Sequence, residues 1–295
     1  MSEDLIKKES TYKKIAKILI KVAITILCFW YISTKINFNQ TINSIIKADL
    51  RFLFAALVML MISKLFSAYR LNIYFRNIHL KIPEWQNIKL YLLGMFYNLF
   101  LPGAISGDAY KVIYLKKKMN APFKKTSAAV LLDRFSGLLS VGILMAISGI
   151  LVLPGWWMDI LLFAGSLLAI GGLYLVVKYF LKDFFPGFWP AFFWGMGVQI
   201  SQVISLYFIL LSLHIDTDFA TWVFIFLVAS VVAVLPLSLG GGLGTREFVF
   251  VTGAEYFILN PETGLTVSLI FFVITVLSSV GGAYFIFKDP LPSHG

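Results

Sequence analysis

Two long apolar runs of this chain are interrupted by the same pattern, which limits how the chain can fold more than any other feature. In 101–107 and again in 235–241, Leu-Pro is followed by three spacer residues and a small pair that ends in Gly. Proline removes a backbone donor and glycine loosens the chain, so each pattern is expected to break a helix. Lipid tolerates such breaks only where protein or water covers the freed backbone groups. Paired breaks in the two halves of a membrane chain are typical of a transporter binding site.

The composition places this chain in a membrane. Hydrophobic residues make up 59% of it and charged residues 14%, whereas soluble domains are about half apolar and a quarter charged. No hydrophilic stretch is long enough for a separate soluble domain, so we expect a single membrane domain over 1–295. The net charge of +10 lies in short loops. It therefore indicates orientation and affinity for anionic lipid, and no nucleic-acid partner is expected.

The predicted fold is an all-α polytopic membrane protein with about six full spans and two re-entrant helical hairpins. A span needs roughly 20 apolar residues. The predicted spans are 18–34, 51–70, 126–152, 159–178, 191–213 and 264–287. The two broken regions, 88–115 and 220–259, are the predicted hairpins. Their first arms are about 18 Å and about 24 Å long at 1.5 Å per residue. Two full spans with a tight turn in each region, ten spans in all, are the alternative.

Positive charge in the loops predicts which side each segment faces. The lysines before the first span place the N-terminus in the cytoplasm, and the basic residues at 70–89 and 116–125 place both flanks of the first broken region there too. The acidic loops at 216–218 and 262 lie outside by the same reasoning. The first hairpin then enters from inside and the second from outside. The halves, about 1–153 and 159–288, thus form an inverted repeat in the cytoplasmic membrane, with both termini in the cytoplasm.

Five charged residues fall in or beside the broken regions. A charge at the bilayer centre costs on the order of 3 kcal/mol, so such residues usually face a cavity or a partner. The five are Asp108, Asp133, Arg134, Arg246 and Glu247. Asp133 shares one helical face with Thr126, Gly137 and Ser140, and this polar stripe is expected to face the protein interior. Whether the acids only form fixed pairs with Arg134 or Arg246, or also exchange partners during function, stays open. Lys64 is expected to snorkel to the inner surface.

The glycine-rich run that follows the second break favours an anion. Gly241, Gly242 and Gly244 lead into Thr245 and Arg246 at the start of a helix. Helix N-termini attract anions and arginine binds phosphate through two donors, so a phosphate-bearing headgroup suits this segment. A turn needed only for tight packing is the alternative. Asn98, one turn before Pro102, is expected either to satisfy backbone groups freed by the break or to touch substrate.

Evidence for catalysis or cofactors is lacking. The three histidines lie in or near loops or the tail, away from any nucleophile signature, and no cluster has the spacing of metal ligands. We therefore expect no enzyme activity, no metal and no cofactor.

Three motifs occur in order: Asn98 to Gly103 with Gly107, Asp108 and Lys111; then Asp133-Arg134; then Pro236 with the run Gly240 to Glu247. In this order they resemble a known family, the transmembrane region of lysylphosphatidylglycerol synthase, which is the flippase-like domain of the multiple peptide resistance factor. The family more usually has Gly-Gly-Asp and Glu-Arg where this chain has Ser106-Gly107-Asp108 and Asp133-Arg134. Larger relatives carry a C-terminal aminoacyl-transferase domain. This chain ends at Gly295, so we expect no synthase activity.

The resemblance implies movement of lipid between leaflets, and the residues indicate a membrane site for an anionic headgroup. We expect a flippase for an anionic phospholipid or a polyprenyl-phosphate-linked lipid. The alternative is a membrane protein that binds lipid, or partners a glycosyltransferase, without transporting anything. A homo-oligomer or a lipid-modifying enzyme partner is left open. The expected substrate-binding residues are Asn98, Pro102, Gly107, Asp108, Lys111, Asp133, Arg134, Pro236, Gly241, Gly242, Gly244, Thr245, Arg246 and Glu247.

Overall fold

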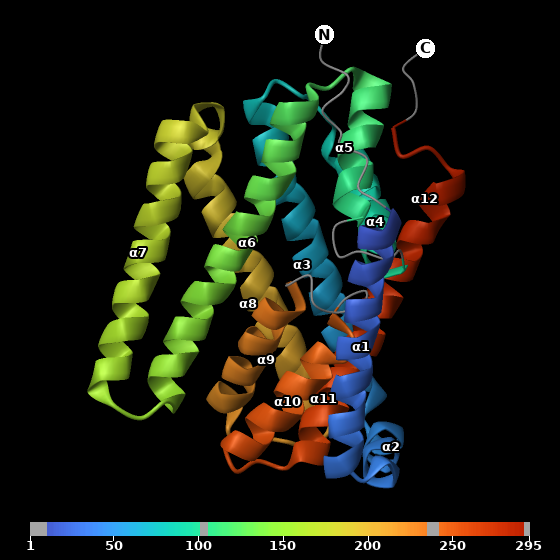
Figure 1. The fold of residues 1–295 in the computed structure, drawn as a ribbon, viewed down its shortest axis with the longest axis vertical. Helices are drawn as coiled ribbons and strands as arrows, with labels where there is room; N and C mark the ends of the chain where they lie inside the picture. Colours follow the sequence, from blue (N-terminus) through green and yellow to red (C-terminus); the bar gives the residue numbers. More distant parts are fainter. Residues whose placement is uncertain (1–10, 101–105, 235–241, 292–295) are drawn as a thin grey trace.

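The computed structural model describes residues 11–100, 106–234 and 242–291, which form helices joined by loops (Figure 1). The helical segments in chain order are α1 (Thr11–Lys35), α2 (Phe38–Lys47), α3 (Leu50–Asn77), α4 (Glu84–Phe100), α5 (Ser106–Met119), α6 (Phe123–Val152), α7 (Trp156–Phe180), η1 (Lys182–Gly187), α8 (Phe188–Ser212), α9 (Phe219–Val234), α10 (Thr245–Tyr256), α11 (Pro261–Val280), η3 (Gly281–Ala283) and α12 (Tyr284–Phe287). The prediction of an all-α membrane protein is confirmed.

Within the described ranges, five helical segments are long and apolar enough to cross a bilayer. They are Leu50–Asn77, Phe123–Val152, Trp156–Phe180, Lys182–Ser212 and Pro261–Phe287. These segments match five of the six predicted spans, of which 191–213 runs one residue past the end of its segment. The remaining one, 18–34, lies in α1, whose apolar part Val22–Lys35 is shorter. The count of six full spans therefore stays a prediction.

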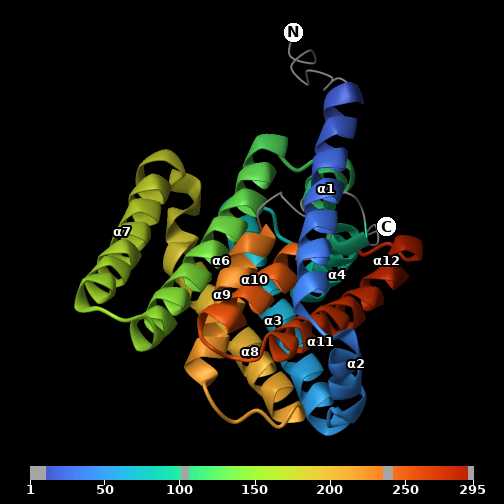
Figure 2. The ribbon, with the colours of Figure 1, turned by 60° about the horizontal axis from the view of Figure 1, so that its bottom comes forward.

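The two broken regions form two helix pairs that open toward opposite ends of the bundle. In Figure 1, α4 and α5 lie toward the upper end of the bundle, which also holds α12, whereas α9 and α10 lie toward the lower end. In the turned view of Figure 2, too, α9 and α10 lie beside each other. With 17, 14, 16 and 12 residues, these four helices are shorter than the spanning segments. This is the arrangement that re-entrant hairpins require, and their depth in a bilayer stays a prediction.

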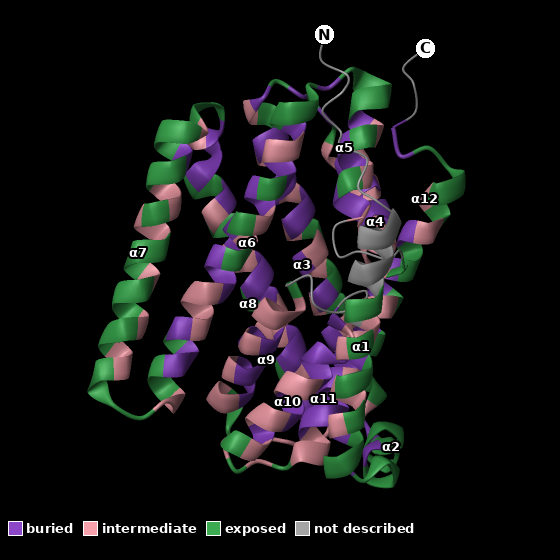
Figure 3. Cartoon of the chain, in the orientation of Figure 1, coloured by how far each residue is buried: buried purple, intermediate pink, exposed green. Residues whose placement is uncertain are grey.

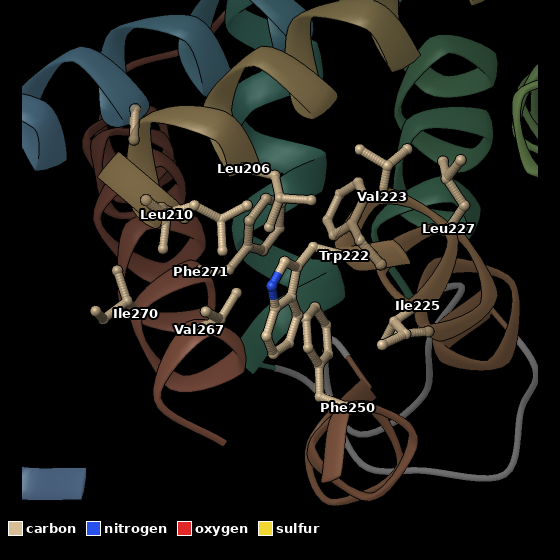
Figure 4. Close-up of a cluster of buried hydrophobic side chains, with 14 of the residues drawn as sticks. Leu206, Leu210, Trp222, Val223, Ile225, Leu227, Phe250, Val267, Ile270 and Phe271 are labelled. Atoms are coloured by element: carbon tan, nitrogen blue, oxygen red, sulfur yellow. The ribbon is translucent and has the colours of Figure 1, made fainter. Parts of the chain in front are cut away.

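Each helix pair is held by its own apolar cluster. Around α9 and α10, Trp222, Phe226 and Phe250 pack with Phe271 of α11 and Leu206 of α8 (Figure 4). In a bilayer such contacts stabilise mainly through van der Waals packing, because lipid tails are as apolar as the side chains themselves. This cluster fixes the α9–α10 pair relative to α8 and α11.

The second cluster surrounds α4 and α5. It joins Leu90 and Leu115 of this pair to Tyr74 and Phe75 of α3 and to Phe188 at the start of α8. Since α3, α6 and α8 each contribute to both clusters, these three long helices connect the two hairpins.

One long helix stands apart from this core. Most residues of α7 are exposed in Figure 3, and it packs chiefly on α6 and η1. Between α6 and α7 lies an apolar groove of about 410 Å³, lined by residues that include Phe135, Leu139, Leu162 and Ala169.

Candidate functional site

The first hairpin closes through hydrogen bonds close to its break. Asn98 accepts a hydrogen bond from the N–H of Gly107 through its side-chain oxygen, 2.9 Å away, and the Ser106 hydroxyl donates to the Tyr97 carbonyl at 2.7 Å. Of the two roles expected for Asn98, the structure has the first, because its side chain satisfies a backbone N–H. Pro102 lies outside the described residues.

Gly107 is needed for the close approach of α4 and α5. A Cβ atom at Gly107 would lie 1.8 Å from the carbonyl oxygen of Gly94, a distance that no packed side chain can adopt. This small residue therefore lets two helix backbones touch, as is common between membrane helices.

Asp108 is the charged centre of the first hairpin. It lies buried in the first turn of α5 and accepts hydrogen bonds from Lys111, at 3.0 Å, and from the guanidinium of Arg134 on α6. Lys111 is itself buried, with its ammonium 4.3 Å from the centre of the Tyr91 ring. The structure thus brings together three of the predicted site residues, Asp108, Lys111 and Arg134.

Asp133 pairs with an arginine that the sequence analysis placed elsewhere. Arg70 on α3 donates to both carboxylate oxygens of Asp133, from Nε at 2.7 Å and from Nη2 at 3.2 Å. The assignment of Arg70 to the cytoplasmic flank was wrong, because α3 continues two turns further to Asn77 and buries it. The predicted stripe on α6 is confirmed for Thr126, Asp133 and Ser140, which are buried.

A signal for Arg70 was present in the sequence. Ser63, Ser67, Arg70 and Tyr74 are offset by positions that fall on one helical face, and all four are buried. The Arg70 guanidinium fits because of a glycine on α6. A Cβ at Gly137 would meet its Nη1 at 3.0 Å.

The second hairpin places Arg246 and Glu247 at the start of α10. Glu247 accepts hydrogen bonds from the N–H of Gly244 at 2.7 Å and from the hydroxyl of Ser268 at 3.2 Å. This carboxylate therefore caps the helix N-terminus that the sequence seemed to offer to an anion. Thr245 is buried and donates to the carbonyl of Gly242.

Two glycines of this segment adopt backbone angles that favour glycine. Gly242 and Gly244 have φ values of 87° and 86°, in the region where a Cβ causes strain. The turn itself therefore requires glycine at these two positions, and their role in binding stays a prediction. Gly241 and Pro236 lie outside the described residues.

Arg246 is buried against α11. Its Nη2 donates to the Ser268 carbonyl at 3.3 Å and lies 4.0 Å from Glu247, and its guanidinium carbon lies 5.1 Å from the centre of the Phe271 ring. The Nε atom has no hydrogen-bond partner in the part of the chain that the structure describes.

Lys64 lies beside residues from both halves of the chain. It lines a small cavity of about 40 Å³ with Tyr91 of α4 and Ser278 of α11. Tyr91 also contacts Lys111. That the Lys64 ammonium reaches the inner surface stays a prediction.

A further set of contacts ties the C-terminal segment to α5 outside the spans. Asp289 accepts hydrogen bonds from Tyr114 and Lys118 of α5 and from the N–H of Leu291 at 3.0 Å. Burial works against ionisation of Asp289, but the hydrogen bonds from Lys118 and Tyr114 outweigh it and hold the pKa of this carboxyl below its usual value. Elsewhere in the described ranges no three His, Cys, Asp or Glu residues come together as metal ligands would.

Residues 18–188 and 182–282 match the lysylphosphatidylglycerol synthase TM region, which is most of the chain. The chain belongs to this family. It is also 30% identical over 138 residues to a UPF0104 membrane protein of Pyrococcus horikoshii, a match that covers 46% of this chain and 40% of that protein's length. The family resemblance inferred from the three motifs is confirmed. The family is that of a membrane region associated with lysylphosphatidylglycerol synthesis, so a relation to membrane lipid follows for this chain.

Proposed function

We propose that this chain moves a lipid with an anionic headgroup between the leaflets of the cytoplasmic membrane, while the acyl or prenyl chains stay in the surrounding lipid. The observation that carries the proposal is the cluster of buried charges that α3, α5 and α6 bring together. Arg134 and Lys111 share Asp108, and Arg70 holds Asp133. A further buried arginine, Arg246, lies at the start of α10 in the opposite hairpin. Membership of a family tied to lysylphosphatidylglycerol supports a lipid substrate.

Arg134 is the residue that first meets the headgroup. Its side chain is 30% exposed, against 7% for that of Asp108. When a phosphate draws Arg134 away, Asp108 keeps its hydrogen bond to Lys111 at 3.0 Å. The Asp108 carboxylate is then not left buried without a partner. Loss of the last partner of a buried charge would cost about 3–5 kcal/mol. Because Asp108 is shared with Lys111, Arg134 can leave it for the headgroup and return to it at a low cost in free energy.

Loop charge sets the orientation in this proposal. The N-terminal lysines and the basic ends of α3 and α5 face the cytoplasm, so the α4–α5 hairpin receives lipid from the inner leaflet and the α9–α10 hairpin faces the outer one. Transport in this proposal is passive or coupled to an ion gradient.

The test is leaflet exchange in vesicles that hold the purified protein and headgroup-labelled phosphatidylglycerol. A membrane-impermeant quencher reports how fast inner-leaflet label reaches the outside. We expect exchange by the wild type, its loss in Arg134→Ala, and normal exchange in the control Arg76→Ala, because Arg76 pairs with Glu84 at an exposed site.

Two outcomes would contradict the proposal. If the folded Arg134→Ala protein exchanges lipid at the wild-type rate, Arg134 has no role in transport. If wild-type protein retains lipid through purification and yet exchanges no lipid tested, the chain is a lipid-binding protein without transport.

A further inference from the structure

A basic cavity lies where α6 begins and α7 ends. It has a volume of about 320 Å³, and its lining holds three lysines and one acidic residue. Lys125 of this lining pairs with Asp183 at 2.7 Å. The other two lysines, Lys124 and Lys182, form no ion pair within the described part of the chain. The cavity therefore offers two positive charges to an anion.

The start of α6 adds to this positive charge. The N-terminus of a helix carries a partial positive charge, which acidic residues normally stabilise. The first turn of α6 holds no acidic residue, and no side chain caps it. Lys124 and Lys125 lie in this turn instead. An anion in the cavity would therefore stabilise the lysines and the end of the helix together.

The cavity and the apolar groove between α6 and α7 lie on the same face of α6. Lys124 and Ala128 line the cavity, whereas Phe135, Leu139 and Gly142 line the groove. Their spacing in the sequence places all five on one side of a helix. Ala128 and Phe135 are roughly 10 Å apart along the helix axis, at about 1.5 Å per residue.

The lining residues of α7 show the same continuity. Phe180 lines the cavity, and Leu173, Ala169 and Leu162 line the groove, again with spacings that fall on one helical face. The two helices lie beside each other in Figures 1 and 2. The cavity is thus the mouth of the groove. One leaflet with its headgroups is about 20 Å deep, so a single lipid can occupy both.

We propose that an anionic phospholipid binds to α6 and α7, with its phosphate in the basic cavity and one acyl chain in the groove. The apolar groove accepts a hydrocarbon chain, which a soluble anion lacks. Lys124 and Lys182 favour a headgroup with net negative charge over a zwitterionic one, as basic pockets between membrane helices do. Neither lining includes Asp108 or Arg134, so this lipid is distinct from the one that we propose is transported.

The test locates the bound lipid by photolabelling. Purified protein in nanodiscs of phosphatidylcholine receives a trace of phosphatidylglycerol, or of phosphatidylcholine, with a photoreactive group on one acyl chain. After irradiation, peptide mapping measures how much label lies on the groove residues between 135 and 146 of α6 and between 161 and 173 of α7.

Two kinds of variant test the two parts of the site. Lys124→Gln, alone and with Lys182→Gln, removes positive charge, and the control Lys47→Gln alters an exposed lysine on α2. Gly165→Leu fills the groove without a backbone clash, because a Cβ there would have no atom within 4 Å. Gly171→Leu is the matched control, since its Cβ position is equally open but lies outside the groove lining.

We expect phosphatidylglycerol to label the groove of the wild type more than about tenfold above phosphatidylcholine, because each lysine beside an anionic headgroup strengthens binding about fivefold. Lys124→Gln should lower this preference about fivefold and the double variant should remove it, while Lys47→Gln keeps it. Gly165→Leu should reduce labelling of the groove by both lipids, and Gly171→Leu should not.

Three results would overturn the inference: equal labelling of the wild-type groove by the two lipids, an unchanged preference in the folded double variant, or unchanged labelling in Gly165→Leu. An unlabelled groove in a protein that purifies as a dimer would also overturn it, by assigning the groove to a second copy of the chain. Leaflet exchange is a separate measurement, so transport that depends on Arg134 can fail while this lipid site stands, and the reverse.

Discussion

The buried pair between Arg70 and Asp133 allows a quantitative test of what holds the long helices together. Replacing Arg70 with Met removes two hydrogen bonds, of 2.7 Å and 3.2 Å, and leaves the Asp133 carboxylate buried with a side-chain exposure of 10%. Removing one partner of a buried pair costs about 3–5 kcal/mol. We therefore expect Arg70→Met to lose about that much free energy of unfolding.

A double-mutant cycle separates the loss of the pair from the loss of packing. Replacing both partners with apolar groups removes the stranded charge, so Arg70→Met with Asp133→Leu should be far less destabilised than the sum of the single variants. The matched control is Arg76→Met. Arg76 and Glu84 have side chains that are 57% and 32% exposed, and such exposed pairs contribute about 0–1 kcal/mol.

The assay is equilibrium unfolding in mixed micelles, in which rising dodecyl sulfate is followed by circular dichroism and tryptophan fluorescence. Comparison of the wild type, Arg70→Met, Asp133→Leu and the double variant gives the coupling energy between Arg70 of α3 and Asp133 of α6. The reasoning is refuted if Arg70→Met loses no more stability than Arg76→Met, or if the double variant is as unstable as the sum of the single ones.

Two further predictions use the same measurements. Gly107→Ala should destabilise the protein by about 1–3 kcal/mol or more, since its Cβ would meet the Gly94 carbonyl oxygen at 1.8 Å. The control Gly142→Ala, whose Cβ would have no atom within 4 Å, should be neutral or slightly stabilising. Equal stability of both variants would contradict the close contact. Asp289→Asn should loosen the C-terminal segment, seen as faster amide exchange at Leu291. The pKa of Asp289 is lowered in the folded protein, so its contribution is present above the unfolded value of about 3.9 and is lost as pH falls through the folded value. An effect of Asp289→Asn that is the same at pH 7 and at pH 2 would contradict this reasoning.

Local chemistry explains which parts of this architecture the sequence predicts. Hydropathy and the two Leu-Pro breaks depend on neighbouring residues, so they predict the long helices and the short helix pairs. Asp108 and Arg134 lie in motifs that meet in space. The inverted repeat and the sides from which the pairs enter rest on loop charge, and depth in the bilayer rests on arm length; these stay predictions.

The errors and omissions concern contacts between helices that are distant in the sequence. Counting positive charges assigned Arg70 to the loop side, whereas its spacing from Ser63 and Tyr74 on one helical face points inward. The place of Lys64 beside Ser278 depends on how α3 packs against α11, which neither segment encodes alone. Glu247 lies three residues after Gly244, a spacing that predicts a capping box. The Glu247 carboxylate then occupies a backbone N–H group that the sequence analysis had assigned to an anion.

The isolation of α7 makes the lipid itself a part of this fold. The groove of about 410 Å³ between α6 and α7 has an apolar lining, with Gly142 and Gly165 open toward it. Hydrocarbon chains that fill this space would pack against α7 as core side chains pack against a helix in a water-soluble domain. The spacing of α6 from α7 would then follow the length and saturation of the surrounding acyl chains. Phe135, which lines the groove, directly follows Arg134 in α6, so bilayer composition would act mechanically on the residue that we expect to receive the headgroup.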